Sequence, residues 1–201
     1  MIRTIVLDIG QVLAAFRWED YLKDCGYDDE TRDKVGKATV LSKYWGEHDR
    51  GVLSDEEVMK LCCQLDPSVE TEIRKLFQEL TKTVVEYPYS RNFIRSLKEN
   101  GYKVYFLSNY EGGSFAYARK HFTFIPEADG QVISYEVKHI KPEKEIYEAI
   151  IQKYGINPEE AVFLDDSAAN IKGAERFGFH TILFTDYEKA LGELRELGVR
   201  I

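Results

Sequence analysis

The sequence predicts an α/β fold with a doubly wound parallel sheet, interrupted by an inserted helical segment. Short, continuous apolar runs rich in Val, Ile, Leu and Phe have the composition of strands buried on both faces. Helical periodicity lies between the later runs, and such alternation of strands and helices is typical of a doubly wound sheet. The chain has 201 residues, of which 44% are hydrophobic, enough for one such domain and a modest insertion.

The predicted elements follow in chain order. Strands are expected at residues 2–7, 104–107, 161–164 and 181–184. Helices are expected where apolar residues recur at helical spacing, in segments 93–97, 146–154 and 171–177. Proline followed by acidic residues, at Pro142 and again at Asn157-Pro158, marks two helix starts, because a helix N-terminus accepts both residue types.

The segment between the first two strands does not alternate and is predicted to be a string of helices. Ser54 and Glu57 form a capping box, and an apolar stripe runs through residues 73–80. We therefore expect a helical insertion over residues 16–87 and a core domain made of residues 1–15 and 88–201. An insertion directly after the first strand lies above the carboxyl edge of the sheet, where ligands bind in this class of fold.

Composition excludes several classes of function. The formal net charge is −8 without a basic cluster, which argues against binding to nucleic acid and to anionic membranes. No apolar run approaches the roughly 20 residues of a membrane span, and no signal-peptide pattern opens the chain, so we expect a cytoplasmic monomer or small homo-oligomer. Cys25 and the pair Cys62-Cys63 form no CxxC motif, so we expect reduced thiols that contribute to packing.

Polar residues follow the predicted strands at the edge where the strands end. Any one of them has an ordinary structural explanation as a helix cap or a turn former. Together, and in this order, they are hard to attribute to caps, and they predict a site at the carboxyl edge of the sheet. The residues are Asp8, Ser108-Asn109, Lys141 and Asp165-Asp166.

This order of motifs resembles the haloacid dehalogenase (HAD) superfamily. The likeness consists of Asp8-x-Gly10, Ser108-Asn109, Lys141-Pro142 and a final Asp165-Asp166-Ser-x-x-Asn segment, and it covers nearly the whole chain. It implies a Rossmann-like HAD core with a small helical cap formed by the insertion. Within the superfamily the sequence is similar to sugar phosphatases of the glucose-1-phosphatase type, which share the Asp-x-Gly form.

The resemblance implies a Mg²⁺-dependent phosphatase acting on a small phosphorylated metabolite such as a sugar phosphate. Asp8 would be the nucleophile that forms an aspartyl-phosphate. Mg²⁺, which prefers oxygen ligands, would be held by Asp8, the backbone carbonyl of Gly10 and Asp166. Asp165 would either reach the ion through water or hold Lys141.

The same resemblance implies the phosphate contacts. Ser108 and Asn109, with backbone amides that follow Asp8, would bind the phosphoryl oxygens that are transferred. Lys141 would offset the negative charge of Asp8 and of the phosphate. Without a cation and this lysine, clustered carboxylates and a phosphate would repel one another strongly.

Gly10 departs from the commoner Asp-x-Asp pattern of the superfamily, in which the second aspartate protonates the leaving group and then activates water. The following residues, Val12-Leu13-Ala14-Ala15, offer no substitute. Three explanations stay open: a substrate with a good leaving group such as an anomeric or acyl phosphate, an acid supplied by the cap such as Glu47 or Asp49, or weak or lost activity.

The cap segment from Tyr44 to Gly51 is the best candidate for substrate contact, because aromatic, acidic and basic side chains crowd into it. Trp45, Glu47 and Arg50 would contact the substrate, since the segment resembles the Glu-x-x-Arg-Gly-type loop of capped phosphatases. Alternatively, Trp45 packs between cap helices and His48 is a surface residue. Residues 16–18, at the hinge into the cap, could line the same pocket.

Two other classes of function stay open. A haloacid dehalogenase uses the same aspartate nucleophile on carbon without a metal, but the adjacent acids Asp165 and Asp166 argue against it, since they make little sense without a cation. A binding protein that kept the fold and lost the reaction is compatible with Gly10.

Overall fold

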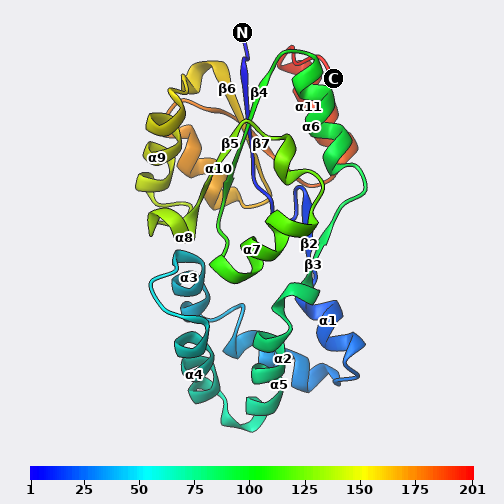
Figure 1. Ribbon diagram of the computed structural model, residues 1–201, viewed down its shortest axis with the longest axis vertical. Helices are drawn as coiled ribbons and strands as arrows, with labels where there is room; N and C mark the ends of the chain where they lie inside the picture. The colour runs from blue at the N-terminus through cyan, green and yellow to red at the C-terminus, as the bar shows by residue number, and fades with distance from the viewer.

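The computed structural model describes residues 1 to 201 and has a parallel sheet at one end and a group of helices at the other (Figure 1). The five strands have the order β5-β4-β1-β6-β7, and every neighbouring pair is parallel. This confirms the predicted doubly wound α/β fold. The strands are β1 (Thr4–Leu7), β4 (Lys103–Ser108), β5 (Gly130–Ile133), β6 (Ala161–Asp165) and β7 (His180–Leu183).

Helices cover both faces of the sheet (Figure 1). α6 (Ser90–Glu99) and α11 (Tyr187–Glu196) pack on one face, and α9 (Lys144–Tyr154) and α10 (Ala168–Glu175) pack on the other. Successive residues of β1 point to opposite faces: Ile5 and Leu7 join the larger apolar cluster, while Val6 joins the smaller one. Burial on both faces explains why β1 is continuously apolar in sequence.

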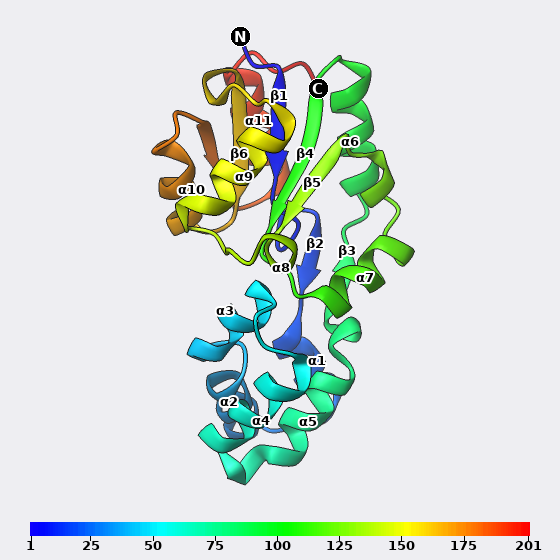
Figure 2. The same cartoon turned by 60° about the vertical axis from the view of Figure 1, so that its left-hand side comes forward.

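Two short elements at the carboxyl edge of the sheet face the helical end of the molecule (Figure 2). These are α7 (Gly112–His121), which follows β4, and α8 (Ser134–Val137), which follows β5 directly. A two-stranded antiparallel sheet of β2 (Ala14–Phe16) and β3 (Val84–Glu86) carries the chain into the insertion and back. Both crossing segments therefore lie next to the edge where β1 ends.

The insertion consists of helices packed around an apolar cluster of their own, which includes Cys62 and Cys63. The predicted capping box is confirmed: Ser54 accepts from the amide of Glu57, whose carboxylate accepts from the amide of Ser54. We keep residues 16–87 as the proposed limits of the cap. Its elements are α1 (Trp18–Asp24), α2 (Asp29–Ala38), α3 (Lys43–Arg50), α4 (Asp55–Leu65), η1 (Pro67–Val69), α5 (Glu70–Gln78) and η2 (Leu80–Thr83).

Two local expectations differ from the structure, and one strand of the sheet was not predicted. Asn157-Pro158 begins only a single 3₁₀ turn, η4 (Pro158–Glu160), because β6 starts at the next residue. β7 is an edge strand in which only Ile182 is buried, so it is not buried on both faces as expected. β5 was not predicted, because its four residues include a single apolar pair, Val132-Ile133. A further 3₁₀ turn, η3 (Ile125–Glu127), precedes β5 in the chain. None of the helices has the length and apolar character needed to cross a membrane.

Candidate active site

The polar residues predicted at the strand ends converge at one edge of the sheet. Asp8 follows the last residue of β1, Ser108 ends β4 and Asp165 ends β6. The register aligns these ends, because Leu7 of β1 pairs with Phe106 on one side and with Leu164 on the other. The switch in strand order, from β4 and β5 on one side to β6 and β7 on the other, lies at β1, which is where a doubly wound sheet binds its ligands.

Lys141 lies between two carboxylates at this edge. Its Nζ is 2.9 Å from Oδ1 of Asp8 and 2.6 Å from Oδ2 of Asp165, and it also donates to the carbonyl of Leu107 at 2.8 Å. All three charged residues are buried, with 3% of Lys141, 7% of Asp8 and none of Asp165 exposed. A buried ammonium with three acceptors is fully satisfied, so it fixes the two carboxylates relative to each other.

The charges of Asp8, Lys141 and Asp165 shift the pKa values of Asp8 and Lys141. Burial raises the pKa of Asp8 to about 6; Lys141 opposes the rise and Asp165 adds to it. Burial alone would lower the pKa of Lys141, but the carboxylates of Asp165 and Asp8 outweigh burial and raise it. At neutral pH the site therefore holds an ionised Asp8 beside a protonated lysine, as a carboxylate nucleophile requires.

Asp165 is fully occupied by hydrogen bonds within the protein. Besides Lys141, its carboxylate accepts from the amide of Ser167 at 2.8 Å and from Nδ2 of Asn170 at 2.9 and 3.1 Å. Of the two roles expected for Asp165, holding Lys141 is the one its contacts provide. A water-mediated contact to a cation is compatible with this arrangement but is not needed to explain it.

The residues present fit a divalent cation. Asp8, Asp165 and Asp166 each offer a carboxylate oxygen, and these oxygens lie within 4.8 Å of one another. Three carboxylates face one ammonium group, so the group carries excess negative charge that a divalent ion would offset. Partial desolvation and the neighbouring Asp165 raise the pKa of Asp166, as expected for an acid held among other acids. An all-oxygen donor set is the one that Mg²⁺ prefers.

Ser108 and Asn109 have different surroundings. The hydroxyl of Ser108 is buried beside Asp8 and finds no hydrogen-bond partner of good geometry within the protein, which leaves it available to a ligand. Asn109, in contrast, pairs with the backbone of Lys141: Oδ1 accepts from its amide at 2.7 Å and Nδ2 donates to its carbonyl at 3.0 Å. The side chain of Asn109 thus positions the lysine, and only its second N–H is left for a phosphoryl oxygen.

A cavity of about 110 Å³ lies between this edge and the cap. Neither Asp8 nor Lys141 lines it; Gly10 and Asn109, their close neighbours, form its core side, so the cavity opens beside the nucleophile. Trp45 lines the cap side and also stacks on Phe16, with ring centroids 5.8 Å apart. Both readings of Trp45 are therefore compatible with its position, since it packs within the cap and faces the cavity. The remaining lining residues are Ala14, Ala15, Phe16, Asp49, Leu80, Thr83, Val84, Tyr110, Glu111 and Ser114.

Glu47 and Arg50 do not line this cavity. Arg50 donates to both carboxylate oxygens of Glu143, at 2.6 and 2.7 Å, and so links the end of α3 to the residue before α9. Glu47 lies 3.4 Å from the same guanidinium. The hydrogen bonds from Arg50 lower the pKa of Glu143 to about 2. In this conformation Arg50 joins the cap to the core and Glu47 lies beside it on the same helix, so contact of these two residues with substrate stays a prediction.

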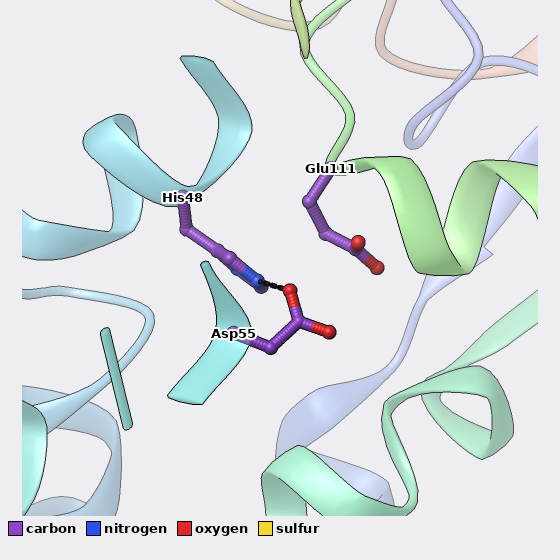
Figure 3. A group of neighbouring side chains, drawn as sticks. All are labelled: His48, Asp55 and Glu111. Atoms are coloured by element: carbon purple, nitrogen blue, oxygen red, sulfur yellow. Dashed lines mark hydrogen bonds and ion pairs between the residues drawn. The ribbon is translucent and has the colours of Figure 1, made fainter. Parts of the chain in front are cut away.

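His48 is not a surface residue, contrary to expectation, because only 1% of it is exposed. Its ring packs against Trp45 at 5.3 Å between centroids, and Nε2 lies 2.9 Å from Oδ1 of Asp55. Figure 3 shows this pair from α3 and α4 facing Glu111, which caps α7 by accepting from the amides of Gly113 and Ser114. This cluster forms part of the boundary between cap and core.

Sequence reasoning missed Tyr110 and Glu111 as cavity residues. Both follow Ser108-Asn109 directly, so extending the strand-end argument by two positions would have found them. The hydroxyl of Tyr110 is buried without a partner, and burial together with Glu111 raises its pKa above the usual value. Asp49 was considered only as an alternative source of a proton, because the sequence does not tell which face of its helix meets the core.

The parallel sheet and the buried charged group at its carboxyl edge define an α/β protein with a candidate active site, and comparison with known proteins identifies its family. The model of the haloacid dehalogenase-like hydrolases matches residues 2–178. The chain therefore belongs to the haloacid dehalogenase-like hydrolases, and the resemblance inferred from its motifs is confirmed.

Curated relatives include phosphatases of similar length. The chain is 29% identical to a D-ribitol-5-phosphate phosphatase of Bacteroides thetaiotaomicron, over 90% of this chain and 91% of that protein. It is 24% identical to a sesquiterpene phosphatase of Aspergillus oryzae, over 97% of this chain and 96% of that protein. Other relatives are longer: the chain spans 37% of the drimenol cyclase of Aspergillus calidoustus, with 22% identity over 98% of its own length.

Among solved structures, a HAD family enzyme from Bacteroides thetaiotaomicron in complex with magnesium and inorganic phosphate superposes with a TM-score of 0.71. The two are 23% identical, and the likeness covers 94% of this chain and 99% of that one. At this identity the comparison shows a shared fold.

Proposed function

We propose that this hydrolase is a Mg²⁺-dependent phosphatase of small phosphorylated metabolites such as sugar or polyol phosphates, acting through an aspartyl-phosphate on Asp8. The observation that carries the proposal is the buried Asp8–Lys141–Asp165 group with Asp166 beside it. The names of the two full-length phosphatase relatives support the reaction class. One of them acts on a polyol phosphate, which supports a small, hydroxylated leaving group.

The residues have distinct tasks in this reaction. Asp8, ionised and held by Lys141, attacks phosphorus and displaces the alcohol. Ser108, whose hydroxyl has no partner of good geometry in the protein, donates to a phosphoryl oxygen. Water then attacks phosphorus of the aspartyl-phosphate, which releases phosphate and regenerates the carboxylate of Asp8.

Asp8, Asp166 and the carbonyl of Gly10 would hold Mg²⁺, with Asp165 holding Lys141. When bound, the ion offsets the charge of the carboxylates and the phosphate and polarises a phosphoryl oxygen. A metal-independent dehalogenase would gain nothing from Asp166, which only adds negative charge to a site that is already anionic. A binding protein would not need an ionised carboxylate fixed in the manner of a nucleophile.

A substrate panel tests the proposal. Release of phosphate from alkyl, aryl and anomeric phosphates should require Mg²⁺ and should stop in EDTA, and no halide should be released from 2-chloropropionate. Asp8→Asn should be inactive, whereas Asp33→Asn, an exposed aspartate on α2, should keep full activity. Metal-independent halide release, or phosphate release by Asp8→Asn at the wild-type rate, would overturn the proposal.

A further inference from the structure

The core offers no proton donor for the leaving group at the position of Gly10. A Cβ atom placed on Gly10 would meet nothing within 4 Å, so open space takes the place of an acidic side chain. Ala14 and Ala15, which line the same cavity, are apolar. An acid that acts here must come from another element that lines the cavity.

Two carboxyl groups line the cavity, those of Glu111 and Asp49. Glu111 accepts hydrogen bonds from the amides of Gly113 and Ser114, so both of its carboxylate oxygens are engaged in capping the start of α7. The carboxyl group of Asp49 makes no hydrogen bond or ion pair within the protein. Glu47, the other acid considered in this segment, lies outside the cavity near Arg50.

Asp49 is held firmly against the core although it belongs to the cap. Its backbone carbonyl accepts from Oγ of Ser134 at 2.5 Å, and the same hydroxyl accepts from the amide of Tyr110 at 2.9 Å. The end of α3 is therefore tied to the segment that follows Ser108 and Asn109. This anchor holds Asp49 at the cavity that Gly10 also lines.

The charges around Asp49 come from several elements. Burial raises its pKa to about 7; Glu111 and Asp8 add to the rise, while His48 of its own helix and Lys141 oppose it. Tyr110 also faces this group and contributes a neutral hydroxyl. A carboxyl group that gains and loses its proton near neutral pH suits general acid–base catalysis.

We propose that Asp49 of the cap is the general acid and base that Gly10 cannot be: it donates a proton to the leaving oxygen and then accepts one from the attacking water. The proposal rests on the phosphatase function proposed above. In the first step Asp8 forms a bond to phosphorus, the ester P–O bond breaks, and the departing oxygen takes the proton of Asp49 and leaves as an alcohol. In the second step the carboxylate of Asp49 takes a proton from water while the water oxygen attacks phosphorus. The bond between phosphorus and Asp8 breaks, phosphate leaves, and Asp49 is protonated again.

The test compares two leaving groups in wild type and in Asp49→Asn, both at saturating Mg²⁺. For a primary alkyl phosphate such as ribitol 5-phosphate, kcat of the variant should fall by roughly 10²–10⁴-fold. For 4-nitrophenyl phosphate, whose leaving group needs no proton, formation of the aspartyl-phosphate should change by less than about tenfold, and the intermediate should accumulate because its hydrolysis lacks the base. Asp33→Asn serves as the matched control.

A second variant tests the site independently. Gly10→Asp in the Asp49→Asn background places an acid in the open space beside Gly10 and should restore much of the lost alkyl phosphatase activity. The wild-type dependence of kcat/KM on leaving-group pKa reports the step in which the alcohol leaves and needs no variant to fold: it should be shallow, and a steep dependence would show that no acid acts.

The outcomes separate this proposal from the function on which it rests. If wild type releases no phosphate from any ester with Mg²⁺, the phosphatase function fails. If wild type is active and Asp49→Asn loses equal, small fractions of activity on both substrates without accumulating intermediate, the phosphatase stands and the role of Asp49 is overturned.

Discussion

Replacing Asp8 with asparagine should abolish hydrolysis and yet stabilise the metal-free protein. Only 7% of Asp8 is exposed, and burial raises the pKa of its carboxyl group from the usual 3.8 to about 6. Because the pKa is higher in the folded than in the unfolded state, the folded state binds the proton of Asp8 more tightly than the unfolded state does. This contribution to stability is complete below about pH 4 and is lost as the pH rises through about 6.

The magnitude follows from the same values. At about 1.4 kcal/mol for each pH unit, a rise from 3.8 to about 6 costs the ionised group about 3 kcal/mol at pH 8. Asparagine keeps the shape and removes the charge, but it leaves Lys141 with one carboxylate partner, Asp165, instead of two. The expected net gain is therefore about 1–3 kcal/mol, or roughly 2–12 °C in Tm for a chain of this size.

Urea unfolding of both proteins in EDTA at several pH values measures this gain. The advantage of Asp8→Asn should be near zero at pH 4 and should grow as the pH rises to 8. Adding Mg²⁺ should stabilise wild type more than the variant, because the variant has lost one charged ligand. Asp33→Asn should stay within about 0.5 kcal/mol of wild type throughout. A variant less stable than wild type at pH 8, or an advantage that does not change with pH, would refute the reasoning.

Further predictions concern the metal, the cap and the core. Asp166→Ala should raise the Mg²⁺ concentration needed for half-maximal activity by at least about tenfold, and excess Mg²⁺ should restore part of the rate; no change in the Mg²⁺ titration would remove Asp166 from the site. A double-mutant cycle of Arg50→Met and Glu143→Gln, measured by unfolding, should give a coupling free energy between the two side chains of about 0.5–1 kcal/mol above pH 4.5. This coupling should fall as the pH approaches 2, because the pKa of Glu143 is lowered to about 2. A coupling of zero at pH 7 would mean that the pair does not hold the cap. Gly173→Ala should lower the free energy of unfolding by about 1–3 kcal/mol, because the new Cβ would approach the hydroxyl of the buried Tyr147 to 2.6 Å. Gly192→Ala in α11, where the new Cβ meets open space, should raise the free energy of unfolding by up to about 1 kcal/mol. Equal unfolding midpoints for the two glycine variants would contradict this packing argument.

The convergence of Asp8, Ser108 and Asp165 could be predicted from the sequence because it depends on local pattern and one topological rule. Each residue ends an apolar run, and parallel strands in a doubly wound sheet place their carboxyl ends at one edge. Lys141 was also expected at this edge, but its role beside the carboxylates was implied only by the family resemblance. Its loop is fixed by Asn109, 32 residues away, and no periodicity reports such a contact.

The cap shows where sequence reasoning stops. Arg50 and Glu143 are 93 positions apart and meet only because α3 packs against the core, so Arg50 could equally have faced a substrate. His48 lies in a strongly polar segment, and its burial depends on aromatic neighbours contributed by other parts of the cap, such as Phe77. Asp49 faces the cavity because of the same packing, which no feature of residues 44–51 specifies.

Identification of the phosphorylated residue tests the central claim most directly. Wild-type protein mixed with 4-nitrophenyl phosphate and Mg²⁺, quenched in acid within one turnover and digested, should yield a phosphorylated peptide. Mass spectrometry should place the acid-stable, base-labile phosphate on Asp8, and the modification should be absent without Mg²⁺. A phosphate found on another residue, or full turnover with no covalent phosphate at any time point, would contradict the proposed mechanism.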